Sequence, residues 1–80
     1  MDPRQRRDAT ELLAALLREA RVAAGLSQAE LARTLEEPQS YVSKVETGQK
    51  RVDLFEIHQI ARCLDLPMVD LIREFEERLG

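Results

Sequence analysis

Residues 28–46, QAELARTLEEPQSYVSKVE, decide the fold that the sequence predicts. Apolar residues at helical spacing indicate one short helix over 28–35 and a second over 38–46. Between them stands Glu36-Glu37-Pro38, and Pro38 suits the first turn of a new helix because its φ is preset. Two short helices joined by so brief a break are the parts of a helix-turn-helix, whose second helix can enter the major groove of DNA.

Helical patterns continue on both sides of this segment. Apolar residues recurring at intervals of three and four predict five helices in all, over residues 9–24, 28–35, 38–46, 54–64 and 67–78. Capping boxes are expected to open three of them: Asp8 with Glu11, Ser27 with Glu30 and Asp53 with Glu56. The predicted fold class is therefore all-α, a compact five-helix bundle that contains a helix-turn-helix.

Length and composition agree with one small domain. The 80 residues are 44% hydrophobic, which is too apolar for a disordered tail, and the abundance of Leu, Ala, Glu and Arg disfavours a β-sandwich. Residues 1–7 show no apolar periodicity and are expected to form a flexible basic arm, with a single domain over 8–80. One cysteine, no signal-peptide pattern and no apolar run near the roughly 18 residues of a membrane helix predict a cytoplasmic protein without membrane contact.

The net charge of −3 argues by itself against a nucleic-acid partner. The charge is unevenly distributed, however. Residues 1–51 hold nine basic and eight acidic side chains, whereas residues 52–80 hold three and seven, so most of the acidity belongs to the C-terminal part. Within 38–51 the balance is +2, from Lys44, Lys50 and Arg51 against Glu46. A DNA-binding segment is therefore compatible with the acidic total.

Catalysis is poorly supported by the sequence. His58 is isolated on the expected outer face of its helix, and Cys63 lies among apolar residues as a small buried side chain. No nucleophile triad, metal-ligand cluster or phosphate-cradling glycine loop is present. The chain is predicted not to be an enzyme and to need no metal or cofactor.

Three segments resemble the Cro/cI-like helix-turn-helix repressors, known as the XRE family: GLSQAELA at 25–32, QSYVSKVETGQKR at 39–51 and IARCLDLP at 60–67. The resemblance extends over about residues 13–72 and implies a lambda-repressor-like fold. It also implies a sequence-specific DNA-binding transcriptional regulator, repressor-like, that acts as a homodimer on a palindromic operator. Double-stranded DNA is then the expected partner.

The resemblance assigns roles to individual positions. Base contacts are implied for residues of the second helix of the motif: Gln39, Ser40, Tyr41 and Lys44. Phosphate contacts are implied for the first residue of the motif, one further residue of its second helix and the following loop: Gln28, Ser43, Gln49, Lys50 and Arg51. Arg21 and Glu46 are expected to form a partly buried ion pair as scaffold. For Tyr41 two readings remain open, contact with a thymine methyl or the backbone, or local packing on the helix over 28–35.

Two features leave the function open. Glu36 and Glu37 replace the glycine and apolar residue usual in this turn, which predicts a strained or differently shaped turn and modest DNA affinity. Ile72, Phe75 and Leu79 extend past the usual end of the family and are expected at a dimer interface, the alternative being that Phe75 and Leu79 fold back on the first helix. The second functional hypothesis is a protein-interaction module, such as an antitoxin or a regulator's partner, with weak DNA binding.

Overall fold

The computed structural model describes residues 2–80, which form five helices. They are α1 (Pro3–Ala23), α2 (Gln28–Leu35), α3 (Gln39–Glu46), α4 (Leu54–Cys63) and α5 (Met68–Leu79). Within these residues there is no β-strand. The all-α, five-helix prediction is confirmed, and the bounds of α2 to α5 lie within a residue of those expected.

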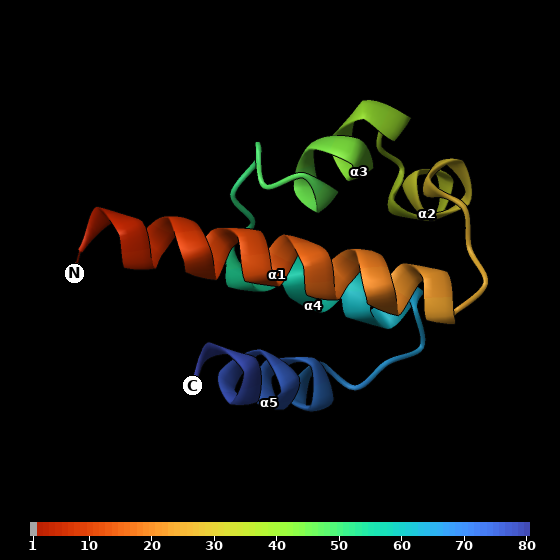
Figure 1. Ribbon diagram of the computed structural model, residues 1–80. Helices are drawn as coiled ribbons and strands as arrows, with labels where there is room; N and C mark the ends of the chain where they lie inside the picture. The colour runs from red at the N-terminus through yellow and green to blue at the C-terminus, as the bar shows by residue number, and fades with distance from the viewer. Residues whose placement is uncertain (1) are drawn as a thin grey trace.

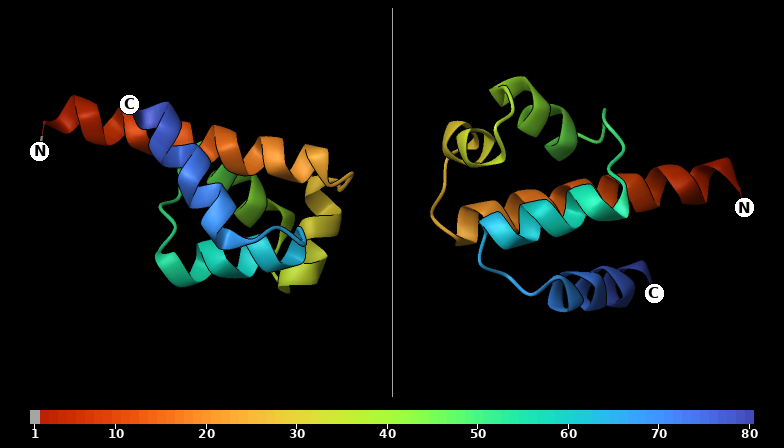
Figure 2. Two further views of the ribbon diagram at one scale, coloured as in Figure 1. Left: turned by 90° about the horizontal axis from the view of Figure 1, so that it is seen from below. Right: turned by 180° about the vertical axis from the view of Figure 1, so that it is seen from behind.

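The long helix α1 runs along the whole molecule, with α2 and α3 on one side of it and α5 on the other (Figure 1). Seen from below, α1 and α4 lie at opposite edges and α5 crosses between them (Figure 2). Helix α3 packs against both α1 and α2, and α5 packs against both α1 and α4. The start of α1 and the end of α5 lie at the same end of the molecule (Figure 2).

The core lies where the inner faces of all five helices meet. Its largest fully buried side chain is Leu17 of α1. Ala32 is almost completely buried, and its small side chain allows the axes of α2 and α3 to approach closely. The core consists of ten buried residues: Leu16, Leu17, Leu31, Ala32, Val42, Val45, Ile57, Ile60, Leu64 and Leu71.

The prediction was wrong about the start of α1. The helix begins at Pro3, so residues 3–7 are helical where a flexible arm was expected, and Asp8 lies inside the helix instead of capping it. Asp2 is the actual cap: its Oδ1 accepts from the N–H of Arg4 at 2.9 Å, and its own N–H donates to Gln5 Oε1 at 3.2 Å. Pro3 favours this start because it presets φ and lacks an N–H that would be unsatisfied there. Met1 of the predicted arm lies outside the described residues.

The other two predicted capping boxes are confirmed. Ser27 Oγ accepts from the N–H of Glu30 at 3.0 Å, and Glu30 Oε1 accepts from the N–H of Ser27 at the same distance. Asp53 and Glu56 exchange the equivalent bonds at 2.8 and 3.0 Å. These two boxes fix the first residues of α2 and α4, and so they fix where each preceding loop ends.

The turn between α2 and α3 places a glutamate in the left-handed region. Glu36 has φ 58° and ψ 40°, and the N–H of Glu37 donates to the carbonyl of Ala32 at 2.9 Å, which closes the end of α2. Gly25 and Asp65 also have positive φ, 76° and 53°, at the ends of α1 and α4. Of the two predicted turn shapes, the structure therefore has the strained one. The left-handed conformation of Glu36 costs about 1–2 kcal/mol of folding free energy, because this residue has a β-carbon.

None of the helices over residues 3–79 combines the length and the apolar character that crossing a membrane requires.

Candidate nucleic-acid interface

Helix α3 presents a polar face to solvent. Val42 and Val45 turn toward the core and are almost completely buried. Gln39, Ser40 and Lys44 are exposed, and Ser43 is half-buried beside them. Residues three and four positions apart are neighbours on the surface of a helix, and these spacings link the four side chains into one stripe, hereafter the α3 stripe.

A buried ion pair holds α3 against α1. Arg21 Nε donates to Glu46 Oε2 at 2.6 Å and Arg21 Nη2 donates to Glu46 Oε1 at 3.0 Å, with side chains only 10% and 3% exposed. Arg21 Nη1 also donates to the carbonyl of Leu26 at 2.7 Å. The hydrogen bonds to Glu46 raise the pKa of Arg21. The expected scaffold pair is therefore present, and it joins the end of α1, the loop before α2 and the end of α3.

Gln28, the first residue of α2, belongs to the same group of contacts. Its Nε2 donates to Glu46 Oε1 at 3.1 Å, so the side chain is directed toward α3. The amide keeps one N–H and its carbonyl oxygen for another partner. The sequence placed Gln28 at the start of α2 and did not show that it would share Glu46 with Arg21.

Tyr41 is half-buried, and its ring packs against the edge of the core. Its hydroxyl donates to Glu56 Oε2 at 2.7 Å, at the start of α4. Burial, followed by the hydrogen bond to Glu56, raises the pKa of Tyr41. The structure thus packs the Tyr41 ring against the core and joins its hydroxyl to α4, while contact of the exposed part of the ring with DNA stays a prediction.

Glu56 has contacts that its role as a helix cap did not predict. Besides capping α4 it accepts from Tyr41, and its Oε2 lies 3.1 Å from Lys50 Nζ. The backbone N–H of Asp53, the Tyr41 hydroxyl and Lys50 together lower its pKa to about 2. Lys50 Nζ also lies 5.5 Å from the centre of the Tyr41 ring. Glu56 therefore ties α3 and the following loop to α4.

The loop after α3 contains three of the residues that are expected to contact phosphates. Gln49 and Arg51 are exposed, and Lys50 is half-buried because Glu56 holds it. The N–H of Lys50 donates to the carbonyl of Lys44 at 3.1 Å, which fixes the loop to the last turn of α3. In Figure 1 this loop, α3 and α2 lie on the same side of α1. The exposed Glu36 and Glu37 lie in the turn on that side too.

The outer face of α5 carries exposed apolar side chains. Ile72 is 38% exposed and Leu79 is 53% exposed, and Val69 adds a third apolar residue. Phe75 is half-buried and packs against the core. Phe75 therefore contributes to the monomer's packing and Leu79 is about half exposed, while a dimer contact by either residue stays a prediction.

Other chemistry has little support in the residues described. No group of three His, Cys, Asp or Glu side chains in residues 2–80 is arranged to hold a metal ion. His58 is exposed on α4, and burial raises the pKa of the half-buried Cys63 thiol, which disfavours the reactive thiolate.

A family model described as helix-turn-helix matches residues 17–71. A sequence comparison with curated proteins found no match. Among solved structures, the restriction-modification controller protein C.AhdI from Aeromonas hydrophila is 40% identical, covering 78% of this chain and 94% of its own with a TM-score of 0.72. An XRE-family like protein from Pseudomonas syringae is 37% identical, covering 91% and 89%, with a TM-score of 0.82.

The clp gene regulator ClgR from Corynebacterium glutamicum is also similar, with 26% identity, coverage of 90% of this chain and 94% of its own, and a TM-score of 0.81. The family model covers more than half of the chain, and the matched segment includes α2, the turn, α3 and α4. Together with the geometry of α2 and α3, these matches show that the chain belongs to the XRE family of helix-turn-helix DNA-binding regulators.

Proposed function

We propose that this protein is a sequence-specific transcriptional regulator, repressor-like, that binds a palindromic operator as a homodimer through the α3 stripe. The observation that carries the proposal is the stripe itself, in which polar side chains on a short helix face solvent while the buried Arg21–Glu46 pair holds the helix rigidly. A preorganised helix of this length is what the major groove accepts.

Base recognition falls to the first turns of α3. Gln39 can pair through its amide with N6 and N7 of adenine, and Lys44 can donate to guanine. Ser40 is a permissive partner for either. Tyr41 contributes the edge of its ring to a thymine methyl, because its hydroxyl is taken by Glu56.

Backbone contacts flank the stripe. Gln28 stands at the start of α2, where free backbone N–H groups and the helix dipole favour a phosphate. Ser43, Gln49 and Arg51 extend the contact along α3 and the loop. Lys50 can serve a phosphate while Glu56 still orients it, because an ammonium has three donors.

A two-fold dimer is proposed because one eight-residue helix reads too few base pairs for useful specificity. Two copies read half-sites about one helical turn of DNA apart. We assign this contact to the exposed face of α5, which includes Ile72 and Leu79. The half-buried Phe75 packs between this face and the core and completes the proposed interface.

The test is a titration of labelled duplexes, one of random sequence and one from the DNA upstream of the gene, at several salt concentrations. We expect tighter binding to the upstream duplex and a log–log salt slope of about −0.9 for each phosphate neutralised. Gln39→Ala should weaken binding to the operator by about 1–3 kcal/mol while leaving random DNA almost unaffected. Gln59→Ala, the same change at an exposed position of α4, is the matched control.

A protein-interaction module is the second candidate, and one observation favours it. Leu54 and Phe55 are adjacent apolar residues at the start of α4 with 67% and 66% of their surface exposed. A chain that bound neither duplex at low salt would contradict the regulator proposal and support this alternative.

A further inference from the structure

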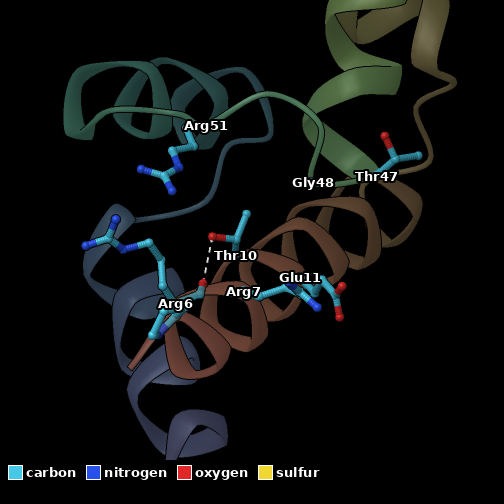
Figure 3. Close-up of a pocket in the computed structure, with 8 residues that line it drawn as sticks. Arg6, Arg7, Thr10, Glu11, Thr47, Gly48 and Arg51 are labelled. Carbon is cyan, nitrogen blue, oxygen red and sulfur yellow. Dashed lines mark hydrogen bonds between the residues drawn. The ribbon is translucent and has the colours of Figure 1, made fainter. Parts of the chain in front are cut away.

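Two adjoining hollows lie where the first turns of α1 face the loop after α3, and Figure 3 shows residues that line the first of them. Their volumes are about 490 and 390 Å³. The first is mostly polar and the second has an apolar floor that includes Leu13 and Val45. Arg6, Thr10 and Arg51 line both, so the two hollows meet between these three residues.

The loop crosses α1 closely at this place. A β-carbon added to Gly48 would lie 3.8 Å from Thr10 Cγ2 and 4.0 Å from Ala14 Cβ. Arg51 extends into the hollow from the loop and Arg6 extends into it from α1. Figure 3 shows both guanidinium groups on the same side of the hollow. Arg7 and Glu11 also line the first hollow, and Figure 3 shows them away from these two guanidinium groups.

These two guanidinium groups have no counter-charge of their own. In residues 2–80 no carboxylate lies within 4.0 Å of the charged nitrogens of Arg6 or Arg51, whereas Arg21, Arg73 and Arg78 each have an acidic partner. The Thr10 hydroxyl donates to the carbonyl of Arg6 at 2.9 Å, so it is not a donor toward the hollow. Among the three residues that line both hollows, the strong donors are therefore the guanidinium N–H groups of Arg6 and Arg51.

Two facing guanidinium groups repel each other, and an anion between them reverses the sign of that interaction. Each presents N–H donors in a planar fork that fits two oxygens of one phosphate. The apolar floor excludes water from one side of the space, which strengthens the attraction relative to an open surface. A carboxylate has only two oxygens, enough for one guanidinium group. A phosphate has more oxygens and can accept hydrogen bonds from both guanidinium groups at once.

We propose that Arg6 and Arg51 form a clamp for a phosphate group, at a site separate from the α3 stripe. The phosphate is supplied either by a small phosphorylated compound or by the backbone of a bound duplex, since both present the same oxygens. Because Arg51 also belongs to the loop proposed to contact DNA, a small phosphorylated compound in the clamp would compete with the duplex for it.

The first arm of the test uses no DNA and so does not depend on the proposed function. Sodium pyrophosphate is titrated into the full chain by calorimetry and by two-dimensional NMR, with sodium chloride of equal ionic strength as reference. We expect saturable binding that Arg6→Gln and Arg51→Gln each weaken about tenfold, as expected for a lost charged hydrogen-bond donor. Arg18→Gln removes the same charge from an exposed position of α1 that lines neither hollow, and it should change the affinity less than about twofold.

The second arm measures duplex affinity against salt for the same variants. If the clamp holds a backbone phosphate, Arg6→Gln lowers the magnitude of the log–log slope by about 0.9 relative to Arg18→Gln. If the clamp serves a free compound, the slopes agree and only pyrophosphate binding is lost. The proposal is overturned if Arg6→Gln and Arg18→Gln behave alike in both arms, with thermal melting confirming that every variant is folded.

Discussion

Arg21 and Glu46 are opposite charges held almost completely out of water. Removing one of them leaves the other buried without its partner, which costs about 3–5 kcal/mol. Arg21→Ala should therefore lower the free energy of unfolding by about that amount, measured by urea denaturation followed by circular dichroism. Gln28 still donates to Glu46 in the variant, but a neutral amide does not replace the lost charge.

The matched control is Arg73→Ala. Arg73 pairs with Asp70 at 3.6 Å, and both side chains are more than half exposed. An exposed pair of this kind contributes little, so the change should be less than about 0.5 kcal/mol. If Arg21→Ala were as mild as this control, the buried pair would not be what holds α1 and α3 together.

Glu56 should make stability depend on acidity. Its pKa is lowered to about 2 in the folded chain, so the unfolded chain takes up a proton near its ordinary value of 4.5 while the folded chain does not. The resulting stability is present above pH 4.5 and is lost as the pH falls toward 2. Because the carboxylate is partly exposed, we expect about 1 kcal/mol, seen as a steeper fall of the melting temperature between pH 5 and pH 2 than in Glu56→Gln.

Two other carboxylates have lowered pKa values, Glu19 beside Arg78 and Glu30 in its capping box. Protonation of these two groups in acid destabilises the wild type and the Glu56→Gln variant equally. The difference between the melting temperatures of the two proteins therefore isolates the effect of Glu56. Parallel curves over the whole range would show that the contacts of Glu56 with Tyr41 and Lys50 contribute nothing to folding.

At the scale of single residues, the important side chains could be identified from the sequence, but not all of their contacts could be predicted. Glu56 was identified as a cap because its partner Asp53 is three residues away, within reach of a local pattern. Its bond with Tyr41 joins residues 15 positions apart. That contact depends on the path of the loop over 47–53, and no periodicity in the sequence specifies such a path.

Among the elements, the turn between α2 and α3 offers a direct test of backbone strain. Glu36→Gly should stabilise the protein by about 1 kcal/mol, because glycine adopts the observed φ of 58° without a clash from a β-carbon. Glu36→Ala removes the same negative charge but keeps the β-carbon, so it should give no such gain. Chemical denaturation of both variants distinguishes relief of strain from relief of charge repulsion, since the second cause would stabilise them equally.

The start of α1 shows why one helix end was misplaced. Residues 2–8 are exposed on every side, so no apolar stripe marks this part of the helix. The local signal was nevertheless present, since Asp2, Pro3 and Gln5 form the pattern of a capping box with proline in the first turn. For α2 and α4 a buried stripe and a capping box coincide, and for α3 and α5 a buried stripe follows a proline, so the bounds of these helices could be predicted within a residue.

For the whole molecule, the proposed dimer makes a clear prediction. Ile72→Arg should convert the dimer to a monomer in sedimentation experiments at micromolar concentration, because it places a charge in the centre of the apolar face of α5. Operator binding should weaken with it, since the two half-sites would no longer be read together.

Phe55→Arg is the matched control, an equally large change at an exposed apolar residue of α4. It should leave the dimer intact. Loss of the dimer in Phe55→Arg but not in Ile72→Arg would move the interface from α5 to α4, and a wild-type chain that sediments as a monomer would remove the dimer from the proposed function.

The buried Arg21–Glu46 pair has a consequence for the order in which the molecule opens. A helix of eight residues is not stable alone in water, so α3 derives its order from the elements that it contacts. Because the pair, Gln28 and the carbonyl of Leu26 join α1, α2 and α3 through one set of bonds, these helices should open as a single cooperative unit. Amide hydrogen exchange should then show α3 protected as strongly as the middle of α1, and Arg21→Ala should release α3 into faster, local exchange.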